Sequence, residues 1–247
     1  MDLPSIYEII GKAIPLACMK YHFMQHALLG LLLLAPMVST MGVQVVNARM
    51  AFFSDAIGHS AFAGVALGIM LSIDPLWSMP LLGVAAGLGI VAMQRRGNLS
   101  TDTAIGVSMS AIVAVGLAIV SRDRHLARNM NSFLFGDILS ISDADILALA
   151  GLFALLMAFQ LWSYNRIALM TVNQIMAKTH GVSVRFYCYA QAALLSALVI
   201  FSVRAVGVFL VTAMLVVPAA TARNLANSAG EMFWWALAVG LSSSVAG

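Results

Sequence analysis

The chain has 247 residues, of which 62% are hydrophobic and 9% are charged, and its formal net charge is +3. A soluble domain averages about 25% charged residues and at most about half apolar ones. This chain therefore cannot bury its apolar side chains inside a globule and still present a polar surface, and we identify it as an integral membrane protein. Its cations are spread along the chain rather than gathered in one basic block, which argues against a nucleic-acid partner.

The N-terminal region, residues 1–24, mixes apolar and polar side chains, which favours an amphipathic segment lying in the membrane interface. Asp2 and Glu8 stand where a secretory signal has its basic region, so we do not expect a cleaved signal peptide. Cys18 and Cys188 match no metal or redox spacing and are expected to be free thiols.

Apolar runs in the rest of the chain are long enough to cross about 30 Å of hydrocarbon. They predict seven membrane spans, over residues 26–46, 53–73, 77–93, 103–120, 146–164, 188–203 and 206–219. Another apolar run opens at Met232 and is still shorter than a span at Gly247, so we interpret it as incomplete. The predicted fold is all-α: a single transmembrane domain over residues 1–247, built as a helical bundle with about seven or eight spans.

Two polar intervals interrupt the spans. Residues 122–131 precede a segment, 133–137, with the composition of a short re-entrant or interfacial turn. Residues 165–187 include a predicted short helix, 172–179, which Gly181 would end. With this second interval inside, seven cations would lie inside and six outside, so the positive-inside rule does not fix the orientation. Nucleotide-binding, hydrolase and paired-cysteine motifs are absent, which favours a pore or carrier over an ATPase or hydrolase.

Asp55 and His59 form an ionisable pair at the start of the second predicted span. Residues four apart share one face of a helix, and a carboxylate with a neutral imidazole suits Zn²⁺, Mn²⁺ or Fe²⁺. The small residues around the pair would let other helices approach closely, so other helices, a partner subunit or water would supply the remaining ligands. Two other interpretations stay open: Asp55 as a helix cap with His59 bonded to a neighbour, and a proton relay.

A second candidate metal pair is His22 and His26, which are also four residues apart, at the mouth of the first span, where they would feed an ion inward. His125 and His180 lie in the polar intervals and are expected to be solvated. The sixteen methionines are interpreted as flexible apolar packing rather than as soft-metal ligands.

Four segments, in this order along the chain, resemble the permease subunits of ABC transporters for zinc, manganese and iron. They read Phe-Ser-Asp-Ala-Ile-Gly-His-Ser-Ala at 53–61, Ser-Thr-Asp-Thr-Ala-Ile-Gly at 100–106, Leu-Phe-Gly-Asp-Ile-Leu at 134–139, and Val-Gly at 206–207 followed by Met-Leu-Val-Val-Pro-Ala-Ala-Thr-Ala at 214–222. The resemblance extends over nearly the whole chain, and four ordered segments are more specific than any one of them.

The resemblance implies an ABC importer permease fold in a bacterial inner membrane. The permease would be a homodimer that works with two ABC ATPase subunits and an extracytoplasmic metal-binding protein. Asp55 and His59 would line the metal path. The ATPase-coupling loop would lie within residues 165–187, with Asn173, Ala177 and Gly181 at its matching positions.

Two departures from the family pattern stand out. Many members carry an acidic residue where this chain has Asn173 and Gln174, which argues against a salt bridge to the ATPase but not against docking. Members also continue past the position of Gly247 with at least one further span, so the chain is either truncated or a short member.

These observations favour the membrane subunit of an ATP-driven importer of a divalent transition metal, with zinc preferred over manganese or iron. Such a subunit is not an enzyme and holds no permanent cofactor, because ATP is used by the partner chain. A secondary transporter, coupled to another cation or to protons, is the first alternative. An intramembrane metalloenzyme is the second, and the missing third ligand motif and general base count against it.

Overall fold

The structure is a computed structural model in which residues 22–97, 99–121, 136 and 141–246 are described. These residues form helices and no strand. The helices are α2 (His22–Asn47), α3 (Phe53–Met70), α4 (Pro75–Gly97), α5 (Thr101–Val120), α8 (Asp143–Val172), α9 (Gln174–Thr179), α10 (Val184–Val206), α11 (Val208–Leu225) and α12 (Ala229–Ala246). Seven of these described helices, all except α9 and α12, are long and apolar enough to cross a membrane. The prediction of an all-α bundle with several membrane spans is confirmed.

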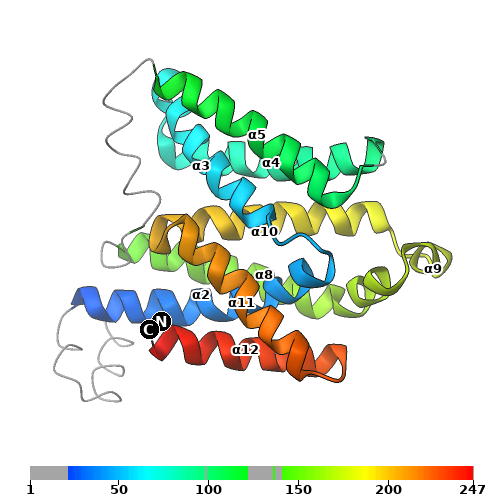
Figure 1. Ribbon diagram of the computed structural model, residues 1–247. Helices are drawn as coiled ribbons and strands as arrows, with labels where there is room; N and C mark the ends of the chain where they lie inside the picture. The colour runs from blue at the N-terminus through cyan, green and yellow to red at the C-terminus, as the bar shows by residue number, and fades with distance from the viewer. Residues whose placement is uncertain (1–21, 98, 122–135, 137–140, 247) are drawn as a thin grey trace.

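Helix α10 crosses the middle of the molecule and lies between two groups of helices (Figure 1). On one side α3, α4 and α5 pack together, and on the other side α2, α11 and α12 do so. Helix α10 contacts members of both groups, and α8 packs along α2. The short helix α9 projects from one end of the molecule, where α8 ends and α10 begins. We refer to this end of the molecule as the α9 end.

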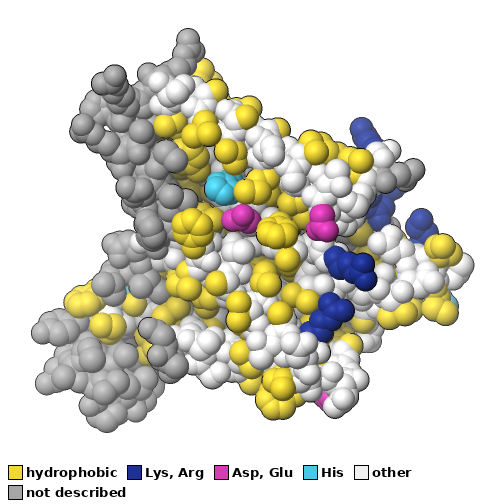
Figure 2. Space-filling view, viewed as in Figure 1, with side chains coloured by type: hydrophobic (Ala, Val, Ile, Leu, Met, Phe, Trp, Pro, Cys, Tyr) yellow, Lys and Arg dark blue, Asp and Glu magenta, His cyan; other side chains and the backbone are white. Residues whose placement is uncertain are grey.

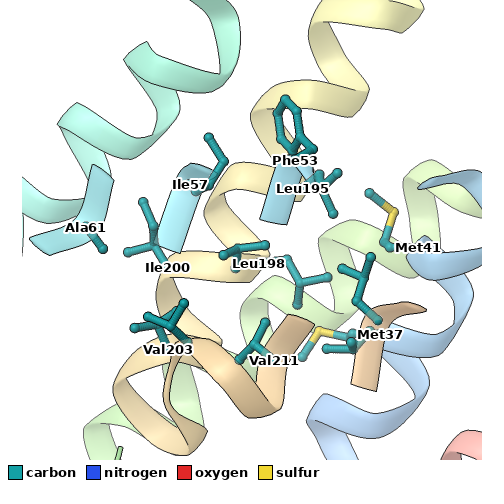
Figure 3. Packing of buried hydrophobic residues seen from close by; sticks show 14 of the residues in the cluster. Met37, Met41, Phe53, Ile57, Ala61, Leu195, Leu198, Ile200, Val203 and Val211 are labelled. Carbon is teal, nitrogen blue, oxygen red and sulfur yellow. The ribbon is translucent and has the colours of Figure 1, made fainter. Parts of the chain in front are cut away.

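The main group of buried apolar side chains lies where α10 meets α2, α3 and α11 (Figure 3). Phe53 opens α3 and is fully buried against this group, which includes Met41 of α2 and Leu195 of α10. Lipid tails are as apolar as these side chains, so dense van der Waals contact, rather than exclusion from water, holds the helices together. This packing anchors the first turn of α3.

Small residues bring α3, α4 and α10 close together. A Cβ atom added to Gly64 of α3 would lie 2.9 Å from the Cα atom of Met79 in α4. A Cβ atom added to Gly87 of α4 would lie 2.0 Å from the hydroxyl oxygen of Ser196 in α10. A larger side chain at either position would push the helices apart, so the Gly-x-x-x-Gly spacings in the sequence do mark close helix contacts.

Several predicted boundaries differ from the helices, and the largest difference is at the end of the fifth span. The sequence predicts that the fifth span ends at residue 164, whereas α8 continues to Val172. Arg166 does not end the helix, because its guanidinium lies over the Trp162 ring, 4.9 Å from the ring centroid, and donates a hydrogen bond to the Tyr187 hydroxyl. An arginine held this way keeps its charge near the interface while its stem stays on the helix. The interval 165–187 is therefore mostly helical.

Helices α10 and α11 meet at Gly207, whose φ of 84° lies in the region that glycine tolerates best. Helix α12 occupies the run that was interpreted as an incomplete span. Of the predicted N-terminal amphipathic segment, only residues 22–24 are described, as the first turn of α2, and of the segment 122–137 only Gly136 is described.

Candidate functional site

Asp55 and His59 both lie on α3, in its first two turns. Four residues apart on a regular helix, they share one face, as predicted. Each is half-buried, so a polar group stands within the helix bundle without being sealed off. Figure 2 shows a histidine beside an acidic side chain over α3, with apolar side chains around them. A carboxylate in the first turn is also favoured by the positive end of the helix dipole.

The alternative in which Asp55 only caps the helix finds no support in the hydrogen bonds. Helix α3 begins at Phe53, and its N-cap residue Phe52 makes no side-chain cap. Across the described ranges, no hydrogen bond or ion pair engages the side chain of Asp55 or of His59. The carboxylate oxygens and the ring nitrogens are therefore free to bind an ion or to exchange a proton.

The first residue of α11 packs closely against α3 at Gly58. A Cβ atom added to Gly58, which lies between Asp55 and His59 in the sequence, would come within 2.6 Å of the Val208 Cγ1 atom. Gly207, the residue before Val208, makes a similar contact: a Cβ atom added to Gly136 would lie 2.3 Å from its backbone nitrogen. Gly58, Gly136 and residues 207–208, which are far apart in the sequence, thus meet at two glycine contacts. The sequence indicated these segments but not that they touch.

Asp55 and His59 do not by themselves complete a metal site. No three His, Cys, Asp or Glu side chains come together as a possible ligand set anywhere in the residues that the structure describes. Four ligands are usual for a closed structural zinc site, whereas fewer protein ligands leave positions open for exchange. A metal ion bound here would take only part of its coordination shell from these two side chains.

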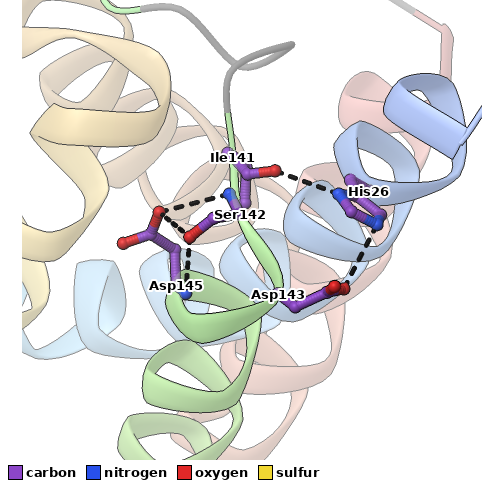
Figure 4. A network of polar contacts seen from close by, with 5 residues as sticks. All are labelled: His26, Ile141, Ser142, Asp143 and Asp145. Carbon is purple, nitrogen blue, oxygen red and sulfur yellow. Dashed lines mark hydrogen bonds and ion pairs between the residues drawn. The ribbon is translucent and has the colours of Figure 1, made fainter.

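His26 occupies a different environment, where α2 meets the start of α8 (Figure 4). Its Nδ1 atom lies 3.0 Å from the Ile141 carbonyl oxygen, and its Nε2 atom lies 3.3 Å from the Asp143 carboxylate. A metal ion would have to replace one of these contacts. The side chain of His22 lies outside the described residues, so a metal role for the pair stays a prediction.

The adjoining N-terminus of α8 carries a capping box, in which Ser142 accepts a hydrogen bond from the Asp145 backbone and the Asp145 carboxylate accepts one from the Ser142 backbone. Asp145 also forms an ion pair with Arg204 of α10 at 3.4 Å. Ser142 is therefore the N-cap of α8. This part of the molecule, at the opposite end from α9, is tied together by polar contacts.

Helix α9 contains the residues predicted to couple to an ATPase, and both of its ends are fixed. Asn173 accepts hydrogen bonds from the backbone N–H groups of Ile175 and Met176, so the residue that departs from the acidic family pattern serves as an N-cap. Ala177 is fully buried against the ends of α8 and α10. Gly181, with a φ of 74°, ends the helix as the sequence predicts.

The C-terminal end of α9 is a Schellman motif. The Gly181 N–H group donates to the Lys178 carbonyl oxygen, and the Val182 N–H group donates to the Ala177 carbonyl oxygen. The exposed side of the helix includes two apolar side chains beside polar ones: Ile175 is 73% exposed and Met176 is 50% exposed. A rigid helix that presents apolar side chains outside the bundle has the character of a docking surface.

Known proteins that resemble this chain are membrane components of metal transport systems. The model of the ABC 3 transport family matches residues 20–247. The high-affinity zinc uptake system membrane protein ZnuB of Haemophilus influenzae is 28% identical over 221 residues, which cover 90% of this chain and 85% of ZnuB. The manganese transport system membrane protein MntC of Listeria innocua is 29% identical over 229 residues, which cover 93% of this chain and 81% of MntC.

Solved structures show the same architecture. PsaBC from Streptococcus pneumoniae in complex with Fab matches with a TM-score of 0.77 and 28% identity, over 98% of this chain and 85% of that one. An inward-facing metal-chelate type ABC transporter matches in fold, with a TM-score of 0.73 at 15% identity, over 90% of this chain and 75% of that one. The family model spans nearly the whole chain, and the relatives agree with it. The chain belongs to the ABC 3 transport family, a family of metal-transporter permeases.

Proposed function

We propose that the chain is the membrane subunit of an ATP-driven importer of a divalent transition metal, with zinc preferred over manganese or iron. The observation that supports this most directly is the free carboxylate and imidazole of Asp55 and His59 on one face of α3. Two ligands from one helix would hold an ion weakly enough for release, and a second copy of the chain or water would fill the remaining positions. The pair suits all three ions, and zinc is put before manganese because imidazole is a ligand typical of zinc whereas manganese favours oxygen ligands.

The proposed partners follow from helix α9. Two ABC ATPase subunits would dock on the α9 helices of a homodimer, against the exposed apolar side chains of Ile175 and Met176. Because both ends of α9 are fixed by hydrogen bonds, movement of a docked ATPase would be passed to α8 and α10 rather than absorbed by the helix. Membership of an ABC family favours this reading over a secondary transporter.

The charges of the described residues support an orientation with the α9 end inside a bacterial inner membrane, although the cations of the whole sequence divide almost evenly between the two sides. Figure 2 shows lysine and arginine side chains gathered toward the α9 end of the molecule. Among the described residues, Arg204 is the cation that lies at the opposite end, where α10 meets α8. Cations are enriched on the cytoplasmic side of membrane proteins. An extracytoplasmic metal-binding protein would then deliver the ion at the end opposite α9.

The test is metal uptake by proteoliposomes that contain the chain, its ATPase and its binding protein. We expect Asp55→Ala/His59→Ala to abolish ATP-dependent uptake of Zn²⁺, Mn²⁺ and Fe²⁺ while the protein still elutes as a folded species. Asp102→Ala is the matched control, because Asp102 is an exposed carboxylate near the start of α5. Uptake by the double variant at the control level would refute the site, and uptake without ATP would refute the ATP-driven mechanism.

A further inference from the structure

A large cavity of about 1110 Å³ opens at the α9 end, between the ends of α2, α4, α8 and α10. It lies apart from the candidate metal site, because neither Asp55 nor His59 is among its lining residues. Cationic side chains dominate its charged lining: Arg49, Arg95, Arg96, Lys178 and Arg185. The described lining includes no Asp, Glu or His. The cavity therefore has a strongly positive wall.

These cations lack counter-charges in the structure. Of the five, none makes an ion pair with any residue that the structure describes. Arg95 is half-buried, and its hydrogen bond within the described chain goes to the sulfur of Cys188 at 3.4 Å. Sulfur is a weak acceptor, and a guanidinium has five N–H donors to satisfy. A half-buried arginine with this single weak partner, surrounded by like charges, would be stabilised by an anion.

The backbone at Arg49 is fixed by the end of α2. Arg49 has a φ of 56° because it follows α2 in a Schellman motif, in which its N–H group donates to the Val46 carbonyl oxygen and the Met50 N–H group donates to the Val45 carbonyl oxygen. The side chain of Arg49 is one of the cations of the wall. The cavity is unsuited to a metal ion, which the positive wall would repel.

We propose that this cavity binds a phosphate-bearing anion. Its cations come from four separate segments, the α2–α3 connection, α4, α9 and α10, and converge on one space. A compact group with several charged oxygens can meet such a wall on more than one side, and the arginine fork matches phosphate geometry. The cavity is also as large as small-molecule sites in proteins, which reach about 1,000 Å³.

Phosphate in this setting has two sources, a phospholipid head group and a soluble phosphate. Below the cations, Val45, Val91 and Leu195 give the cavity an apolar floor, which suits the glycerol and acyl portion of an anionic lipid. Basic pockets between membrane helices are known as head-group sites. The proposal rests on the cavity alone and does not depend on which metal the chain transports.

The experiment uses the purified full chain in detergent, with native mass spectrometry to measure retained ligand. Phosphatidylglycerol and phosphatidylcholine are the lipid probes, and inorganic phosphate is the soluble probe. We expect phosphatidylglycerol to be retained at least about tenfold more tightly than phosphatidylcholine, and Arg95→Gln/Arg185→Gln to lose that preference. Arg223→Gln is the matched control, because Arg223 is exposed near the end of α11 and does not line the cavity.

The lipid and phosphate probes distinguish the two possible sources of the phosphate group. Inorganic phosphate that binds in detergent without phosphatidylglycerol, and whose binding is lost in the cavity variant, identifies a soluble ligand. If Arg95→Gln/Arg185→Gln does not fold, Arg49→Gln/Lys178→Gln replaces it, since both of these side chains are exposed. Three results overturn the proposal: no binding of either anion by the wild type, equal loss in Arg223→Gln, or cavity variants that keep anion binding but lose their ATPase, which would assign the cavity to an acidic protein segment.

Discussion

The two polar regions of this molecule are built in opposite ways. Asp55 and His59 come from neighbouring turns of one helix, which packs closely against other helices at its glycines. The cations at the α9 end come from four segments and surround an open space. A single ion that must be released needs few ligands in a tight setting, whereas a larger anion needs charges spread around a cavity. Packing density, as much as residue type, distinguishes the two.

The largest effect is expected from removing one ligand of the α3 pair. Asp55→Asn keeps the shape of the side chain but removes its charge, so metal uptake should fall at least about 100-fold, since even residues behind a metal ligand are worth 10–100-fold. Retention of phosphatidylglycerol at the cavity should not change. Uptake and native mass spectrometry on the same preparation check both. A parallel loss of uptake and lipid retention would contradict the separation of the two regions.

The tight packing behind the pair can be tested at Gly58. Gly58→Ala places a Cβ atom 2.6 Å from Val208 Cγ1, and the β-branched valine has little freedom to move. We expect the free energy of unfolding to fall by about 1–3 kcal/mol, together with reduced uptake.

Gly89→Ala on α4 is the control for this packing test, because no atom lies within 4 Å of its added Cβ. It should be neutral or stabilising by up to about 1 kcal/mol, since alanine favours helix. Thermal unfolding in detergent measures both variants, and equal Tm values would show that α11 does not press on α3.

At the α9 end, we expect the C-terminus of α9 to be more sensitive to substitution than its N-terminus. Gly181→Ala forces a side chain into a φ of 74° and should cost about 1–2 kcal/mol locally. Amide hydrogen exchange over residues 174–182 should rise, while the α3 region stays protected. Gly151→Ala, in open space on α8, serves as the control. Unchanged exchange in Gly181→Ala would mean that the Schellman motif does not hold α9.

The smallest effect is expected at the other end of α9. Asn173→Ala removes the acceptor for the Ile175 and Met176 N–H groups and should cost about 1 kcal/mol. Asn173→Asp keeps the cap and restores the acidic family pattern. Exchange rates of those two amides measure the change. Faster exchange in Asn173→Asp than in Asn173→Ala would contradict the capping role.

Much of the fold could be predicted from composition and apolar run length. The seven spans were placed correctly because a bilayer demands continuous apolar helix, whatever its neighbours are. The end of α8 was missed, because the rings of Trp162 and Tyr187 accommodate the charge of Arg166 and only the fold brings Tyr187 to it. The end of α9 at Gly181 and the N-cap of α8 at Ser142 depend on residues within a few positions of each other, so they can be predicted from the sequence.

The Asp55–His59 pair and the cationic cavity likewise differ in how far the sequence predicts them. Asp55 and His59 were identified in the sequence because four residues along a helix is a fixed geometry. The meeting of Gly58 with Val208, the contact of Gly136 with Gly207, and the cationic cavity were decided by tertiary packing. No spacing rule relates residues on separate helices, since their distance depends on how whole helices lie against one another. The sequence determines which residues share a face of one helix, whereas only the tertiary structure decides which residues of separate helices come together.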